Sequence, residues 1–486
     1  MSAGLSKSKI AAFEQCPKRL WLGAHRPELG QIDEAVSARF ATGHAVGSAA
    51  CALIPAGVMV EAVPDLAAAE RRTRELLGDG HITAIFEATL SVDGVLVRID
   101  VLEADGNGGW RIAEVKSTTS AKDVHRRDLA TQVWVARSAG LNVSGASIRH
   151  LNRDFVLERE GEYHGVFADA ELLNEISDIV ARRPEIIASA KAALGGPEPG
   201  REVGPHCEDP YPCEFSSYCE AAMPAGPDWP VTILPNGGGK RWLAEGVVDL
   251  LTIDAQRLTN ATHAKVYNAT VTGEPFHDRE RAQAEINQWA YPRTWLDFET
   301  IQFALPRWVG TRPYDQVPFQ FSAHIEHAEG RMEHREFLSL DGLDPRRSCA
   351  EALVAMIPTK GAIVAYNAPF ERGCLTRLAD LFTDLAPTLL SIAARLVDLL
   401  PVTRATWYHR DQRGSWSIKA VLPTVAPQLD YKELQVRDGG NAQAAYLEAI
   451  AEGVTPERIA EIDAALKAYC ARDTEAMVVL ARRLTA

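Results

Sequence analysis

The sequence lacks a hydrophobic run long enough to cross a bilayer. Its longest stretch without a charged residue extends from Ala45 to Val60 and is interrupted by Pro55 and Gly57, whereas a membrane-spanning helix needs about 20 mostly apolar residues. The lysines near the start are not followed by the apolar segment of a secretory signal. These absences predict a soluble, cytoplasmic protein without a membrane partner.

An excess of positive charge is also missing. The 51 lysines and arginines are outnumbered by 65 acidic residues, which gives a formal net charge of −14. A protein that grips duplex DNA by counterion release usually displays a basic face. The charge balance therefore argues against a protein that coats DNA nonspecifically and with high affinity. It leaves open an enzyme with a local basic groove, where bound cations would invert the sign of the charge near acidic residues.

The chain of 486 residues is too long for one ordinary core, and its 46% hydrophobic and 24% charged residues are typical of folded proteins. We find no internal repeat and no low-complexity tail. Two or three domains are therefore expected. The eight cysteines occur without a secretory signal, which favours metal-binding or core roles over disulfides.

Four of the cysteines have a distinctive spacing. Cys16 lies in an early helical pattern, and Cys207, Cys213 and Cys219 follow far downstream with five residues between neighbours. The paired C-x-x-C knuckles of zinc ribbons are missing. Four thiolates from two segments can bind either a [4Fe–4S] cluster or a zinc ion. The other cysteines lie in apolar patterns and are predicted core thiols: Cys51, Cys349, Cys374 and Cys470.

A predicted β-hairpin carries the first group of chemically active residues. Residues 95–102 and 110–116 both read as strands and are separated by a glycine-rich turn. The hairpin would bring Asp100 beside Glu114 and Lys116. Two carboxylates can hold a divalent metal, and an ammonium can orient water or phosphate. The pattern indicates a metal-dependent phosphodiesterase, the alternative being a solvated edge hairpin.

This region resembles the core of the RecB-like PD-(D/E)xK nucleases. Asp100 stands at the first acidic position, Glu114 and Lys116 form the E-x-K, and Gln132 matches the helical glutamine, although the tyrosine that often follows it is missing. His44 matches the helical histidine of many members. The resemblance implies Mg²⁺ or Mn²⁺ bound by Asp100 and Glu114 with help from His44, and catalytic roles for Lys116 and Gln132.

The cysteine pattern resembles the iron–sulfur clasp of the CRISPR-associated and AddB-type branches of the same nucleases. In those branches, the cluster ties the ends of the nuclease domain together. The resemblance implies a [4Fe–4S] cluster held by Cys16, Cys207, Cys213 and Cys219.

A second group of acidic residues lies in the C-terminal half. Asp297 and Glu299 share one face of a predicted strand, and Glu371 begins a helix after a buried strand. Tyr469 and Asp473 are four residues apart on a predicted long helix and therefore share a face. Paired carboxylates of this kind can hold two metal ions.

The order of these motifs resembles the DEDDy exonucleases, the DnaQ-type group of the RNase H-like superfamily. The resemblance implies that Asp297, Glu299, Glu371 and Asp473 bind Mg²⁺ or Mn²⁺ and that Tyr469 positions the attacking water. Glu371 departs from the family, which usually has aspartate there.

Asp398 is a spare candidate for the missing aspartate. Three further segments, 296–300, 313–322 and 366–371, resemble a bacterial domain family of unknown function that commonly follows a RecB-like module.

We therefore expect an α/β protein of two domains. A restriction-endonuclease-like, PD-(D/E)xK domain with an iron–sulfur cluster spans 1–222, a Pro/Gly-rich linker 223–240, a helical connector 241–290 and an RNase H-like exonuclease domain 291–486. The leading hypothesis is a metal-dependent DNA nuclease with two phosphodiester-hydrolysing sites, acting as an exonuclease on single-stranded ends. The alternatives are a nucleic-acid-binding scaffold with one or both sites degenerate, and an RNA 3′–5′ exonuclease.

Overall fold

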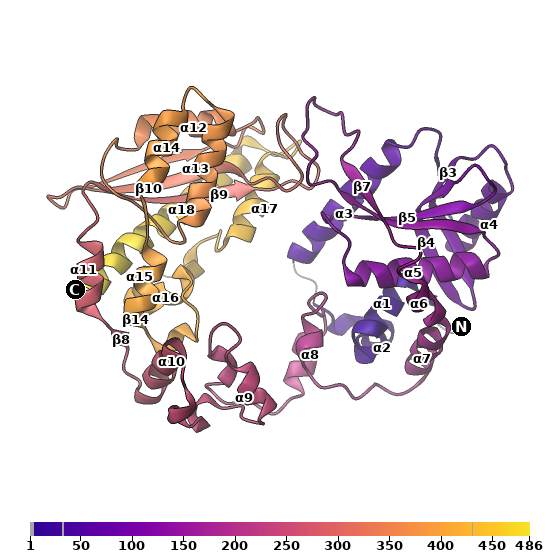
Figure 1. Ribbon diagram of the computed structural model, residues 1–486, viewed down its shortest axis with the longest axis horizontal. Coiled ribbons are helices and arrows are strands. Elements are labelled where there is room, and N and C mark those ends of the chain that lie inside the picture. Colours follow the sequence, from indigo (N-terminus) through magenta and orange to yellow (C-terminus); the bar gives the residue numbers. More distant parts are fainter. Residues whose placement is uncertain (1–3, 32–33, 430) are drawn as a thin grey trace. The chain divides into compact units, whose positions relative to one another are not determined.

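The computed structural model describes residues 4–31, 34–429 and 431–486. The chain divides into two compact units, one formed by residues 1–224 and 303–315 and the other by residues 225–302 and 316–486. Each unit combines its own sheet with covering helices (Figure 1). The mixed α/β architecture expected from the sequence is confirmed.

The first unit is built on a seven-stranded sheet. Its strand order is β2-β3-β4-β5-β6-β7, with β1 beside β4. Neighbours β3, β4 and β5 are antiparallel, whereas β5 and β6 are parallel and are joined through α5. The elements are β1 (Leu5–Ser6), α1 (Lys7–Gln15), α2 (Pro17–His25), α3 (Glu34–Ala52), β2 (Val58–Met59), α4 (Leu66–Leu77), β3 (Ala84–Val92), β4 (Val95–Ala104), β5 (Trp110–Lys116), α5 (Asp123–Ser138), β6 (Val143–Leu151), β7 (Phe167–Glu171), α6 (Ser177–Ala181), α7 (Arg183–Gly195) and α8 (Ser216–Ala221).

Strand β5 directs alternate side chains to opposite faces of this sheet. Ile112 packs into a core shared with Ile10 of α1 and Leu129 of α5. Ala113 belongs to a cluster on the other face, against which Cys51 of α3 packs. Because Glu114 and Lys116 have the same parity as Ile112, they point toward α1 and α5.

Residues 303–315 belong to the first unit, although the sequence assigned them to the second domain. Gly310 donates its backbone N–H to the carbonyl of Leu157 at 2.7 Å, and Leu157 donates to the carbonyl of Thr311 at 3.0 Å. Ala304 adds an apolar contact to the same unit. The predicted boundaries therefore missed an excursion of the chain between β9 and β10, which local sequence patterns do not reveal.

The second unit is built on a five-stranded sheet of order β11-β10-β9-β12-β13, with a separate β14-β8 pair. Strand β9 is antiparallel to β10, which is antiparallel to β11, while β12 is parallel to β9 and β13. The elements are α9 (Lys240–Ala244), α10 (Ala261–Thr272), β8 (Phe276–His277), α11 (Arg279–Ile286), β9 (Arg293–Ile301), β10 (Val317–Glu326), β11 (Met332–Leu338), α12 (Arg346–Met356), β12 (Ile363–Ala365), α13 (Pro369–Leu381), α14 (Ala386–Ala394), β13 (Leu396–Asp398), α15 (Leu399–Thr406), β14 (Trp407–Tyr408), α16 (Ile418–Val425), α17 (Gly439–Ala449) and α18 (Pro456–Thr485).

Alternate side chains of β9 also point to opposite faces of their sheet. Leu296 and Phe298 pack into the core formed with α12, α13 and α14, while Trp295 packs into the core that includes Met477 of α18. Figure 1 shows α12, α13 and α14 together on one face of the sheet. Asp297 and Glu299 have the parity of Trp295 and therefore face α18.

The predicted linker from residue 225 onward and the whole predicted connector are parts of the second unit. Val231, Ile233 and Leu234, inside the expected 223–240 linker, are buried in a core with Trp242. The expected connector 241–290 forms α10 and α11, which pack into the same core. The prediction of a surface linker was wrong over these positions, because closely spaced apolar side chains gain stability by burial. Among the described residues, no helix is long and apolar enough to cross a membrane.

Candidate metal centres

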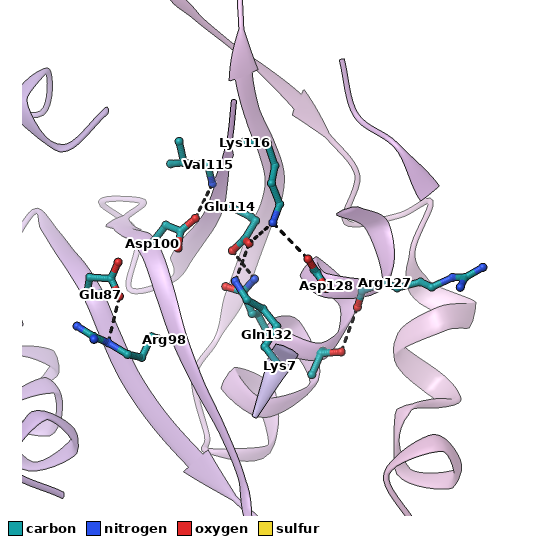
Figure 2. Close-up of polar contacts among 11 residues, drawn as sticks. Lys7, Glu87, Arg98, Asp100, Glu114, Val115, Lys116, Arg127, Asp128 and Gln132 are labelled. Carbon is teal, nitrogen blue, oxygen red and sulfur yellow. Dashed lines mark hydrogen bonds and ion pairs between the residues drawn. The ribbon is translucent and has the colours of Figure 1, made fainter. Parts of the chain in front are cut away.

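The β4–β5 hairpin brings Asp100 close to Glu114 in the first unit. Val101 pairs with Ala113 at the end of the antiparallel register, and Asp100 and Glu114 lie directly beyond this pair on their strands. Asp100 Oδ2 accepts a hydrogen bond from the backbone N–H of Val115 at 2.8 Å, as Figure 2 shows. The structure thus brings the two acidic residues of the predicted site together.

Glu114 is the centre of a dense polar network (Figure 2). Its Oε1 lies 2.6 Å from Lys7 Nζ and 2.8 Å from Lys116 Nζ. Its Oε2 accepts a hydrogen bond from Gln132 Nε2 at 2.6 Å. Lys116 Nζ also pairs with Asp128 Oδ2 at 3.2 Å. Both oxygens of this buried carboxylate therefore already hold donors from the protein itself.

The surroundings shift the pKa values of Asp100 and Glu114 in opposite directions. Burial opposes ionisation of Glu114, but Lys116 and Lys7 outweigh it and lower the pKa of Glu114. Burial, followed by repulsion from Glu114, raises the pKa of Asp100 to about 7. Glu114 is consequently ionised at neutral pH, while Asp100 is poised to exchange its proton for a cation. The Gln132 Oε1 atom is buried without a hydrogen-bond partner among the described residues, so the site fits an additional cation or water.

The structure brings Lys116 and Gln132 to this site, whereas the role of His44 stays a prediction. His44 is exposed on α3, and it has no hydrogen bond or ion pair within the described part of the chain. Helix α3 packs on the sheet face opposite to Glu114. Sequence reasoning missed Lys7, because no local pattern links a residue to a partner 107 positions away.

The four predicted cluster cysteines line one cavity. Cys16, Cys207, Cys213 and Cys219 share it with the cationic side chains of Lys18 and Arg19, among others. All eight cysteines are free thiols. The structure thus brings together four thiols from two distant segments, the donor set that a metal group would need.

Thiolates are donors both for a zinc ion and for a [4Fe–4S] cluster, so this donor set fits either group. The other predicted core thiols, Cys349, Cys374 and Cys470, are buried, and Cys51 is partly buried.

The second unit gathers three carboxylates from two elements. Asp297 and Glu299 of β9 and Asp473 of α18 each offer one oxygen, and these oxygens all lie within 4.8 Å of one another. Because side chains alternate along a strand, Asp297 and Glu299 both face α18. The packing of α18 on the sheet brings Asp473 to them. This geometry fits a divalent metal ion.

Glu371 lies near this cluster. It is in the first turn of α13 just after β12, is 2% exposed, and its Oε2 has no hydrogen-bond partner among the described residues. Burial, and then the charges of Asp473, Glu299 and Glu371, raise the pKa of Asp297. Burial of Glu371 raises its own pKa to about 8. A buried, unpaired carboxylate oxygen beside Asp297 fits a fourth metal ligand.

The spare candidate Asp398 has a structural role instead. Its carboxylate accepts backbone hydrogen bonds from Asn367 at 3.0 Å, Ala368 at 3.1 Å and Leu400 at 3.0 Å. These bonds cap α15 and hold the turn that leads into α13, where Asn367 has a positive φ of 83°. Asp398 therefore positions Glu371 rather than replacing it.

Two tyrosines and one lysine surround Asp473. Tyr431 donates its hydroxyl to Asp473 Oδ1 at 2.5 Å, and Lys419 Nζ donates to Tyr469 Oη at 3.1 Å. Burial, followed by repulsion from Asp473, raises the pKa of Tyr469. Tyr469 therefore stays protonated and acts as a hydrogen-bonding phenol. Sequence reasoning missed Lys419 and Tyr431, which lie outside the recognised motifs.

The carboxylates of this site are mutually destabilising without a cation. Burial and repulsion from Asp473 raise the pKa of Glu299 to about 8, although Lys419 opposes the shift. Burial also raises the pKa of Asp473. Lys419 opposes these shifts for Glu299 and Asp473 but does not cancel them, so bound divalent cations would restore the balance of charge.

We predict that the stability of the metal-free protein falls as pH rises. Glu299 and Glu371 have folded-state pKa values of about 8, above the usual 4.5. The folded state thus binds more protons between these values, and the free energy of unfolding declines by about 1.4 kcal/mol per pH unit for each group. Melting temperatures in EDTA between pH 5 and 8.5 test this.

The control for this prediction is the Glu371→Gln variant, whose decline should be shallower. Mg²⁺ should raise the melting temperature more at pH 8.5 than at pH 5.5. A variant with the same pH dependence as the wild type would contradict the assignment.

The fold and its sites define an α/β protein of two compact units, the second with a carboxylate cluster suited to a metal. Residues 294–417, from β9 to the residue before α16, match a domain family described as a domain of unknown function, DUF2779. The matched segment includes Asp297, Glu299 and Glu371 and ends before Tyr469 and Asp473.

One solved structure, titled "Crystal structure of SSO0001", is similar over 46% of this chain and 89% of its own. The identity is 17% and the TM-score 0.25, values that place no constraint on the fold. No curated protein matches the chain.

Proposed function

We propose that this chain is a metal-dependent nuclease whose main hydrolytic site is the carboxylate cluster of the second unit. The observation that carries the proposal is the convergence of Asp297, Glu299 and Asp473 within 4.8 Å of one another. The unpaired buried oxygen of Glu371 beside them supports it. Carboxylates held this close in a buried site are stable as ions only with bound cations.

In this proposal the four carboxylates hold Mg²⁺ or Mn²⁺. When bound, such ions lower the pKa of water and stabilise the leaving oxygen of a phosphodiester. Tyr469 donates its phenolic hydrogen bond to orient the attacking water, and Lys419 fixes the tyrosine oxygen from the other side. Tyr431 holds Asp473 in the orientation that faces Asp297 and Glu299.

The sheet of the second unit supports an RNase H-like fold. Three antiparallel strands, β9, β10 and β11, are followed by two strands parallel to β9, and the order is β11-β10-β9-β12-β13. The first acidic pair lies on the central strand β9. Glu371 has one methylene more than the aspartate usual at this position, and Asp398 holds the turn at which its helix starts.

The first unit supports a second nucleic-acid site. The β4–β5 hairpin, Gln132 on α5 and the four-cysteine cavity together agree with a PD-(D/E)xK domain closed by a [4Fe–4S] cluster. Asp100 and Glu114 would hold the metal there, with Lys116 near the substrate phosphate. One observation favours a degenerate first site and hence a binding role for this unit, namely the two lysines already bound to Glu114.

The substrate is proposed to be DNA with single-stranded ends, with RNA as the second candidate for the same carboxylate geometry. The test is cleavage of 5′- and 3′-labelled single-stranded DNA and RNA with Mg²⁺ or Mn²⁺, by wild type, Lys116→Ala, Asp297→Ala and the double variant. Cleavage lost only with Asp297→Ala supports the second unit as the working site. Absence of cleavage by the wild type on both polymers would overturn the nuclease proposal in favour of a scaffold.

Lys419→Met tests the arrangement around Tyr469. Removing the ammonium frees the tyrosine hydroxyl and removes a positive charge that stabilises ionised Glu299 and Asp473. We expect kcat to fall by about 10- to 100-fold, with KM little changed. Steady-state kinetics on labelled DNA measures both. Lys360→Met, an exposed lysine in the loop between α12 and β12 of the same unit, is the control. An unchanged kcat would show that Lys419 does not position Tyr469.

A further inference from the structure

Lys7 occupies a fixed position in the first unit. Leu5 and Ser6 form β1, which pairs in parallel with β4 through Leu5–Val95 and Ser6–Leu96. Leu5 is 2% exposed, and the Ser6 hydroxyl caps α1 by accepting the backbone N–H of Lys9 at 3.3 Å. Lys7 is the first residue of that helix. Its backbone is thus anchored on both sides, unlike that of a typical surface lysine.

The anchored side chain of Lys7 reaches the carboxylate expected to bind metal. Its Nζ lies 2.6 Å from Glu114 Oε1, closer than Lys116 at 2.8 Å (Figure 2). An ionised carboxylate oxygen has about two acceptor positions. The two ammonium groups fill those of Oε1, and Gln132 fills one of Oε2.

The two candidate metal sites differ in their balance of charge. In the first, the carboxylates of Asp100, Glu114 and Asp128 face two lysines, and Asp100 tends to keep its proton. In the second, among the described contacts, Lys419 is the cation that lowers the pKa values of Glu299 and Asp473 in a group of four carboxylates. The first site is thus nearly neutral without a metal, whereas the second has a large negative excess.

We propose that Lys7 is a built-in cation that competes with divalent metal for Glu114, so that the first site takes up metal far more weakly than the second. Lys7 leaves Glu114 when a metal ion enters between Asp100 and Glu114. Lys116 remains in place, because its second partner Asp128 holds it at 3.2 Å. The inference rests on the proposed function for the identity of the first site, and it gives the two units different metal requirements.

Mn²⁺ binding tests this proposal without any cleavage assay. Free Mn²⁺ is measured by electron paramagnetic resonance during titration of Lys7→Met and of Lys9→Met in an Asp297→Asn background, which weakens the second site. Lys9 is the matched control, since it lies on the same helix and its ammonium donates to the carbonyl of Gly4 at 3.0 Å. We expect the first site of Lys7→Met to bind Mn²⁺ at least about tenfold more tightly, a gain of about 1.4 kcal/mol, with Lys9→Met unchanged.

Addition of Glu114→Gln to Lys7→Met should abolish the gain. Equal binding isotherms for Lys7→Met and Lys9→Met would overturn the proposal, whether or not the protein cleaves DNA.

The wild type offers a second measurement that needs no variant. Acetylation of Lys7, followed by mass spectrometry, should increase when millimolar Mn²⁺ is added, and unchanged reactivity at a Mn²⁺ concentration that fills the first site would equally overturn it.

Discussion

Asp297→Asn is expected to abolish cleavage and at the same time to stabilise the metal-free protein. Asp297 is surrounded by Asp473, Glu299 and Glu371, and burial together with their charges raises its pKa well above the usual range. An amide of nearly the same shape removes one of four mutually repelling groups and one metal ligand. We expect a loss of activity of about a thousandfold and a higher melting temperature in EDTA.

The combination of opposite effects distinguishes a metal ligand from a structural residue. In the wild type, Mg²⁺ should raise the melting temperature because it binds only the folded state. In Asp297→Asn this increase should be much smaller. Glu329→Gln, an exposed acid in the β10–β11 turn, is the control and should retain both activity and the effect of Mg²⁺. A lower melting temperature for Asp297→Asn in EDTA would contradict the proposed electrostatic repulsion.

Cys213→Ala is expected to remove a cofactor and to lower stability strongly. Cys213 lines the cavity with Cys16, Cys207 and Cys219. Cys16 precedes α2, whereas the other three cysteines lie in α8 and in the segment before it. If a [4Fe–4S] cluster links these segments, the anaerobically purified wild type is brown and contains about four irons per chain. Loss of one thiolate should bleach the protein and reduce the free energy of unfolding by several kcal/mol.

Iron and zinc analysis together with thermal melting tests the cluster. Cys51→Ala is the control, because Cys51 lies outside the cavity and should keep the wild-type colour. Intrinsic chemistry at the carboxylate cluster of the second unit should change less than stability. One equivalent of zinc without iron in the wild type would rule out the iron–sulfur assignment. A Cys213→Ala protein that melts like the wild type would rule out the structural clasp.

The local pairs of site residues were predictable from the sequence. The period of a strand places Asp297 and Glu299 on one face, and the period of a helix does the same for Tyr469 and Asp473. The glycine-rich turn predicted the hairpin that aligns Asp100 with Glu114. The backbone geometry of each element fixes these relations, so they hold whatever the element packs against.

The partners of these residues were not predictable in the same way. Lys7 contacts Glu114 across 107 positions, and Lys419 contacts Tyr469 across 50. Asp398 was a candidate ligand by its motif, yet the structure uses its oxygens to cap backbone amides. Such contacts depend on how distant elements pack, and no short-range period records them.

By itself, the sequence determined the α/β class, the faces on which the acidic residues lie, and the set of cysteines to examine. Only the tertiary structure decided that Glu114 is already paired with two lysines, whereas Lys419 compensates the second cluster only in part. It also assigned residues 303–315 to the first unit. The physical reason is that the pKa of a group depends on its burial and on the charges around it. Both are set by long-range packing of the apolar faces.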